Sequence, residues 1–234
     1  MFYLPLTLNA LKFPNDSGPI YKETLAGRFP VEPFNTYSNL IFLFIVVYFG
    51  LKVYKDARNH KFLAFVLPVI ALSYVGGTIY HGTRSHQFWL QLDYYPIILL
   101  SLLTAFYFIY RWLDRWSLRI GLFLVMLGLY FGLRALPLPK SLQISLGYLI
   151  MAMTILLPVF GYLVKTKWKN YGNIIAAFGV FFLAVFFRFL DKRLDMDFFW
   201  MGTHWLWHLM GGVAVFFLMQ FIFEDKKVQA AGNA

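Results

Sequence analysis

The sequence predicts an all-α integral membrane protein whose fold is a seven-transmembrane helix bundle. The chain of 234 residues is 60% hydrophobic, and its mean hydropathy is +0.62. A soluble domain of this size needs far more polar surface. Apolar runs of about 20 residues, long enough to cross a bilayer, recur along the chain. Short connections separate them, without a repeat or a low-complexity linker.

Seven apolar runs can be delimited as spans. In chain order they are 35–53, 62–81, 93–111, 118–133, 142–164, 171–190 and 204–223, and the fourth is the shortest. Residues 1–34 are expected to form a polar extracytoplasmic segment, residues 35–223 the seven-transmembrane domain, and residues 224–234 a frayed cytoplasmic tail. The first residues lack the charged n-region of a cleavable signal peptide, so none is expected.

Loop charges predict the orientation of these spans. One set of loops carries twelve basic residues against four acids, and the other carries nine against seven. The positive-inside rule therefore places the N-terminus outside and the C-terminus in the cytoplasm. With no signal peptide and no retention residues at the C-terminus, a bacterial inner membrane is expected. The net charge of +10 is spread over short loops, which favours anionic headgroups over nucleic acid as partners.

Polar groups collect at the outer ends of several expected spans. His204 and His208 lie one helical turn apart on one face of the last span. His81 ends the second span at the same side, and Asp93 begins the third there. The chain has no cysteine, so a transition metal would have to be held by histidine and carboxylate. Three imidazoles with a vacant fourth position are typical of catalytic zinc.

The chemistry of such a site needs further groups. Bound Zn²⁺ lowers the pKa of its water to about 7. Asp93 can orient or deprotonate that water. A hydroxyl from Ser38 or Thr78 can stabilise the developing oxyanion.

Each of these residues also has a structural interpretation. Paired histidines at a membrane interface often cap or snorkel. Asp93 can cap the third span, with Pro96 in its first turn. Ser38 can bond back to its own helix. None of these explains why the groups share one depth.

Two further histidines lie outside this set. His60 falls in a basic loop of the opposite side and is expected to be solvated. His86 lies on the same side as the site, in a short polar loop, and is an alternative metal ligand.

Five motifs carry a family resemblance. They are EPFNTYSNLIF at 32–42, YHGT at 80–83, QLDYYP at 91–96, FRFLD at 187–191 and GTHWLWH at 202–208. With these motifs in this order, the chain resembles the alkaline ceramidase family. That family belongs to a superfamily of seven-span metal hydrolases that includes adiponectin-receptor-like proteins.

The resemblance implies a zinc amidase that cuts the N-acyl bond of ceramide, giving a sphingoid base and a fatty acid. It implies that His81, His204 and His208 bind zinc and that Asp93 acts beside them. It also implies a second cation, because family members can hold Ca²⁺ through acids of the N-terminal segment. Glu32 matches one such acid, Glu23 is a candidate for another, and Asp16 lies nearby but out of register.

The chain departs from the family pattern near its first histidine. The family's serine one turn before that histidine is replaced by Gly77, and Thr78 is the adjacent hydroxyl. The spacing from His81 to Asp93 is one residue longer than usual. Gly76 and Gly77 also suit close helix contact.

Farther along the chain, Arg188 and Asp191 are expected to form a structural ion pair beneath the site.

Three functions fit these features. The first is a zinc hydrolase of a ceramide-like lipid amide. The second is a seven-span lipid-sensing receptor with a structural metal, which would need four protein ligands. The third is a lipid esterase or phospholipase with the same zinc site. The open fourth position favours an enzyme.

Overall fold

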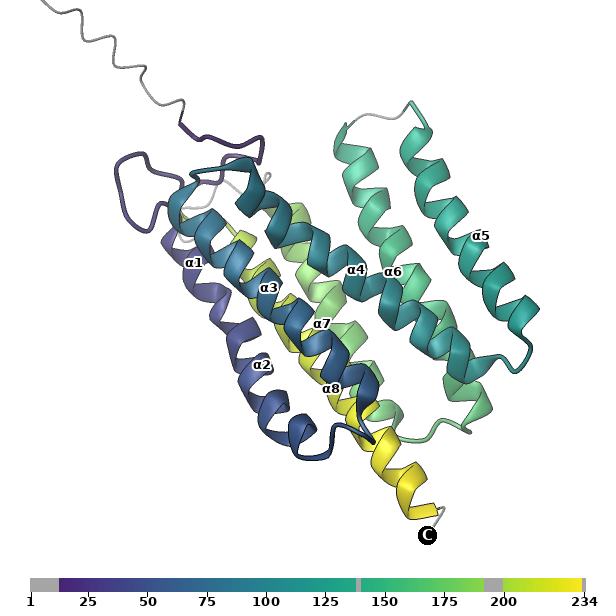
Figure 1. Cartoon of the computed structure of the whole chain (residues 1–234). Helices are drawn as coiled ribbons and strands as arrows, with labels where there is room; N and C mark the ends of the chain where they lie inside the picture. The colour runs from purple at the N-terminus through teal and green to yellow at the C-terminus, as the bar shows by residue number, and fades with distance from the viewer. Residues whose placement is uncertain (1–12, 138–139, 192–199, 233–234) are drawn as a thin grey trace, which may run out of the picture.

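The computed structural model describes residues 13–137, 140–191 and 200–232, and these ranges contain helices and loops but no β-strand. The amino-terminal stretch assessed for a signal peptide lies almost entirely outside them. The elements are α1 (Pro33–Ser38), α2 (Leu40–Val53), the 3-10 helix η1 (Tyr54–Asp56), α3 (Lys61–Thr83), α4 (Gln87–Trp112), α5 (Trp116–Ala135), α6 (Lys140–Lys165), α7 (Tyr171–Leu190) and α8 (His204–Gly232) (Figure 1).

The predicted all-α class is confirmed. Five stretches are long and apolar enough to cross a membrane: Pro33–Asp56, Lys61–Thr83, Gln87–Trp112, Tyr171–Leu190 and His204–Asp225. In α5 and α6 the described apolar stretches are shorter, Trp116–Leu129 and Ala152–Lys165. The outer faces of the helices carry many large apolar side chains, among them Leu124, Val125 and Phe131 of α5. Surfaces of this kind suit contact with lipid.

Helix ends differ from the sequence prediction at three places. The first span is divided at Asn39 into α1 and α2. α4 begins six residues before Asp93, so Asp93 does not cap it, and Pro96 lies inside the helix. The capping interpretation of Asp93 is therefore wrong. α8 does not end at Phe223 but continues to Gly232, so residues 224–232 of the expected tail are helical.

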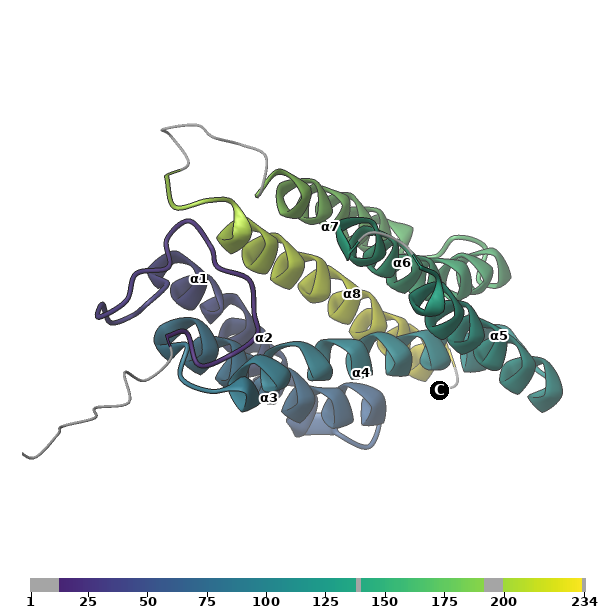
Figure 2. The ribbon, with the colours of Figure 1, turned by 90° about the horizontal axis from the view of Figure 1, so that it is seen from above.

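α8 lies at the centre of the arrangement (Figure 2). It packs against α7 on one side and against α1, α2 and α3 on the other. α4 packs against both α3 and α6. α5 is the outermost helix and packs against α6 and α4. The apolar core is built mainly by α2, α3, α4, α6 and α8, with Phe49, Leu67, Phe108 and Phe221 fully buried within it.

The end of the bundle opposite the predicted site has its own polar contacts. His60 is buried there and stacks on Phe223 with 4.4 Å between ring centroids. The expectation that His60 is solvated is therefore wrong. Close by, Arg111 and Tyr162 both donate hydrogen bonds to Asp225, at 2.9 and 2.7 Å.

Two prolines inside helices free backbone carbonyls for other partners. Proline has no N–H, so the carbonyl four residues earlier loses its helical donor. For Pro68 this carbonyl is that of Ala64, which accepts a hydrogen bond of 3.0 Å from the Tyr54 hydroxyl.

For Pro96 the freed carbonyl is that of Leu92, and α3 approaches it through Gly76. A Cβ on Gly76 would lie 2.5 Å from the Leu92 carbonyl carbon and 2.8 Å from the Asp93 nitrogen. The Ser73 hydroxyl, one turn earlier, donates to the Asp93 carbonyl at 3.0 Å. The close-contact interpretation of Gly76 is confirmed, and this contact fixes the backbone of Asp93 against α3.

Gly76→Ala should therefore destabilise the protein, by about 1–3 kcal/mol, because the new methyl group meets backbone that cannot turn away. Gly179→Ala in α7 is the matched control, since nothing lies within 4 Å of a Cβ there and alanine favours a helix. Thermal unfolding of both variants in detergent tests this. Equal melting temperatures would contradict the close contact.

Candidate metal centre

Three histidines meet where α3 ends and α8 begins. His81, His204 and His208 are buried, with exposed fractions of 0, 5 and 6%. One ring nitrogen from each lies within 4.8 Å of the others. No other set of three metal-ligating side chains comes together in the described part of the chain. The structure thus brings together all three ligands that the sequence predicted.

Hydrogen bonds to Nδ1 set the orientation of all three rings. His81 Nδ1 lies 2.5 Å from Glu32 Oε2. His208 Nδ1 lies 3.1 Å from Ser38 Oγ and 3.2 Å from the Asn35 carbonyl oxygen. His204 Nδ1 lies 2.9 Å from Arg188 Nη1.

The Nε2 atoms remain for a metal ion. His81 Nε2 is buried and has no hydrogen-bond partner among the described residues. His204 Nε2 and His208 Nε2 are 3.1 Å apart. Two nitrogens that bind one zinc ion tetrahedrally at 2.0–2.1 Å would be about 3.3 Å apart. A buried ring nitrogen without a partner is costly, and an ion among these atoms would remove that cost. The residues fit a metal ion.

His204 differs from the other two ligands in its Nδ1 partner. A ligating histidine usually donates its second N–H to an acceptor, but arginine can only donate. His204 Nδ1 must therefore accept, which puts the ring hydrogen on Nε2, facing His208 Nε2. His208 can then donate through Nδ1 to the Asn35 carbonyl. The hydrogen bonds are consistent along this chain of groups. For His204 to hold a metal through Nε2 as a neutral imidazole, its ring hydrogen would have to lie on Nδ1, where Arg188 now donates.

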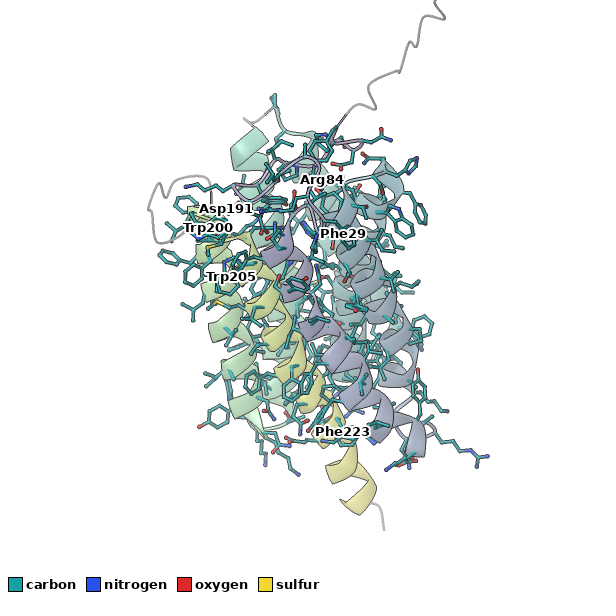
Figure 3. All side chains as sticks on the ribbon, turned by 90° about the vertical axis from the view of Figure 1, so that its left-hand side faces the viewer. Phe29, Arg84, Asp191, Trp200, Trp205 and Phe223 are labelled. Carbon is teal, nitrogen blue, oxygen red and sulfur yellow. The ribbon has the colours of Figure 1, made fainter. Side chains whose placement is uncertain are left out.

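The expected ion pair of Arg188 with Asp191 is present, with Nη1 3.6 Å from Oδ2. Asp191 also accepts a hydrogen bond of 2.9 Å from the backbone N–H of Thr203. The Thr203 hydroxyl donates to the Phe187 carbonyl at 2.7 Å. These contacts tie the end of α7 to the start of α8 and so fix the position of His204. Asp191 and Arg84 lie at the same end of the bundle (Figure 3).

The carboxylate of Asp93, which belongs to α4, lies beside Gly77 of α3. Gly77 is one helical turn before His81. A Cβ on Gly77 would be 2.5 Å from Asp93 Oδ1 and 2.9 Å from Asn39 Oδ1. The carboxylate and the Asn39 amide thus occupy the space that a side chain at position 77 would need. This gives a physical reason for glycine where the resemblance leads one to expect serine.

The two candidate hydroxyls have different surroundings. The Ser38 hydroxyl donates to the Asn35 carbonyl at 3.0 Å, as expected for a bond back to its own helix, and it also contacts His208. It therefore orients the ring of a candidate metal ligand. Thr78 Oγ1 is buried and has no hydrogen-bond partner in the described ranges.

The three N-terminal acids do not share one site. Both Glu23 oxygens accept backbone N–H groups at the start of α1, from Phe34 at 2.8 Å and Asn35 at 2.7 Å. Burial raises the pKa of Glu23 even though these two bonds oppose the change. Asp16 pairs with Arg84. Glu32 bonds to Arg84 and to His81, one of the three candidate metal ligands.

The charge state of Glu32 follows from its partners. Burial on its own raises the pKa of Glu32, but hydrogen bonds from His81 and Thr24 and the charge of Arg84 outweigh burial. The pKa of Glu32 therefore lies below its usual range. An ionised Glu32 accepts a hydrogen bond from the Nδ1–H of His81, which leaves Nε2 free to bind a metal.

Sequence reasoning missed Tyr21 and Arg84. The Tyr21 ring stacks on His204 with 4.1 Å between centroids and an interplanar angle of 12°. It covers the site from the N-terminal segment. An aromatic residue in a loop has no periodic pattern that would have marked it. Arg84 directly follows the YHGT motif, and this position is the sequence feature that could have marked it as a site residue.

His86 does not join the three histidines. It precedes the first residue of α4, and its Nδ1 accepts a hydrogen bond of 3.0 Å from the Phe88 N–H. His86 is an N-cap of α4.

The fold and the site define a helical protein with apolar membrane-length helices and a buried three-histidine centre. No protein-family model matches the chain, and comparison with curated proteins finds no match.

Replacing His81, His204 or His208 with alanine should empty the metal centre, because two imidazoles bind far more weakly than three. The purified parent, washed with a weak chelator and analysed for metals, should retain about one ion per chain. His86→Ala is the control and should keep it. Full occupancy in all three variants would show that the metal binds elsewhere.

Proposed function

We propose that this chain is a seven-transmembrane, zinc-dependent amidohydrolase that cleaves the N-acyl bond of a ceramide-like lipid. The single observation that carries the proposal is the convergence of three buried histidines, one ring nitrogen from each within 4.8 Å of the others, with no fourth protein ligand among the described residues. A structural zinc site usually has four protein ligands, whereas a catalytic site keeps one position open. This argues against a receptor with a structural metal.

The chain's own residues supply the rest of the chemistry. A Zn²⁺ ion held by three imidazoles acidifies water and polarises carbonyl groups, which amide hydrolysis requires. Asp93, as carboxylate, accepts the proton of the attacking water and passes it to the leaving amine. Ser73 and Gly76 hold the Asp93 backbone against α3. The products are a fatty acid and a sphingoid base.

The position of the site suits a lipid amide. The three histidines lie at the end of α3 and the start of α8, each long and apolar enough to cross a membrane. The amide of a ceramide-like lipid lies where its acyl chains meet the polar surface. A site near the ends of two spans is at the corresponding depth. α5 and α6 would complete the seven spans.

Asp93→Asn should reduce ceramide turnover by 10²- to 10⁴-fold, about 3–5 kcal/mol of barrier, because an amide cannot take up the proton. Bound zinc should remain, since the three imidazoles are intact. The measurements are zinc content and lipid products by mass spectrometry.

Asp114→Asn is the matched control for this variant. Its exposed carboxylate pairs with Lys165, and the change should leave turnover unaltered. Unchanged turnover for Asp93→Asn would remove Asp93 from the mechanism. A zinc-loaded parent that hydrolyses esters but not amides would favour the esterase. A parent that hydrolyses neither would favour the receptor.

We propose that the chain lies in a bacterial inner membrane, with the N-terminus outside and the C-terminus in the cytoplasm; the loop charges favour this orientation. When fused after Ala234, a reporter that functions in the cytoplasm should be active, and one that functions only outside the cytoplasm should be inactive. A cysteine introduced at Ser17 should react with a membrane-impermeant maleimide in intact cells. The opposite pair of results would invert the topology.

A further inference from the structure

The Arg84 guanidinium lies in a cage of oxygen atoms. Its Nε and Nη2 donate to Asp16 Oδ2 and Oδ1 at 2.9 and 2.6 Å. Its Nη1 donates to Glu32 Oε1 at 2.5 Å and to the Pro19 carbonyl at 3.1 Å. The second Nη2 hydrogen points to the Gly18 carbonyl at 3.4 Å. The five N–H groups of a guanidinium thus match five oxygen acceptors.

These acceptors are the kinds of group that bind Ca²⁺. Calcium takes carboxylate and carbonyl oxygens, and the cage contains two carboxylates and two main-chain carbonyls. Two of the three acids considered for calcium lie in it: Glu32, which matches the family pattern, and Asp16, which lies out of register. The third, Glu23, faces the start of α1 instead. The residues do not fit a calcium ion, because the cage is filled by a cation of the chain itself.

The backbone at Arg84 supports a role for its side chain. Arg84 is the C-cap of α3 and has φ 48° and ψ 33°, a left-handed conformation. Glycine is preferred at such positions because other residues pay a steric cost there. The side chain is fully buried, as are the Asp16 and Glu32 carboxylates that it meets. Its ion pairs offset the cost of the conformation.

The Glu32 carboxylate connects this cage to the metal centre. One oxygen, Oε1, accepts from Arg84, and the other, Oε2, accepts from His81 Nδ1. We propose that Arg84 is the built-in cation of this site, which holds the N-terminal segment without Ca²⁺ and positions His81 through Glu32. The proposal concerns cation use and metal binding, so it does not depend on the reaction proposed above.

The first test adds Ca²⁺ to the parent protein. CaCl₂ at 5 mM, added to protein freed of divalent ions outside the histidine site, should leave the melting temperature within about 1 °C of that in MgCl₂. A calcium site of sub-millimolar affinity would raise it by several degrees through linkage. A rise of that size with Ca²⁺ alone would overturn the proposal.

The second test removes the guanidinium with Arg84→Gly, which suits the left-handed backbone. The melting temperature should fall by on the order of 10 °C, since two buried carboxylates lose their partner. Affinity of the histidines for Co²⁺, followed by its visible absorption, should fall roughly 10- to 100-fold. Guanidinium chloride at 10 mM should restore part of the melting temperature and part of the Co²⁺ affinity. NaCl at 10 mM should restore neither of them.

Arg28→Gly is the matched control. Arg28 belongs to the same segment but donates to the carbonyls of Glu23 and Val31. Its removal should leave Co²⁺ affinity unchanged, and guanidinium should have no effect. Glu32→Gln should lower Co²⁺ affinity without rescue, and it keeps the proposal testable if Arg84→Gly does not fold. Unchanged Co²⁺ affinity in Arg84→Gly or Glu32→Gln would refute positioning through Glu32.

Discussion

The polar end of the molecule depends on the hydrogen bonds made by the buried carboxylate of Glu32. This carboxylate is fully inaccessible, and a buried charge is tolerated only when it is paired and hydrogen-bonded. Its partners come from separate parts of the chain: Thr24 from the N-terminal segment, and His81 and Arg84 from the end of α3. Satisfying one carboxylate therefore holds the segment, α1 and α3 together.

The same contacts orient the three histidines of the candidate metal centre. Glu32 directs His81, and Ser38 with the Asn35 carbonyl directs His208. Partners of this kind set ring orientation and metal affinity. His204 is the exception, because Arg188 donates to it. The ion pair of Arg188 with Asp191 offers that guanidinium a second acceptor at 3.6 Å.

Close helix contact and chemistry are linked on α3. Gly76 lets α3 approach the Leu92 backbone, and Gly77 leaves room for the Asp93 carboxylate. Two adjacent glycines thus serve two separate purposes. The proline inside α4 contributes, because the Leu92 carbonyl that it deprives of a helical donor faces this contact. A larger residue at either position would push Asp93 away from the turn before His81.

The sequence by itself determined the helical class, the membrane-length helices and the three histidines, because these depend on local composition and on spacing along one helix. Two ligands four residues apart share a face whatever the tertiary structure is. Only the tertiary structure decided which side chains contact one another around these histidines and at the helix ends. The burial of His60 against Phe223 and the capping of α1 by Glu23 arise from contacts between segments. So does the Arg84 cage, since residues 68 apart in sequence meet there. Long-range pairing of charges leaves no periodic pattern in a single sequence.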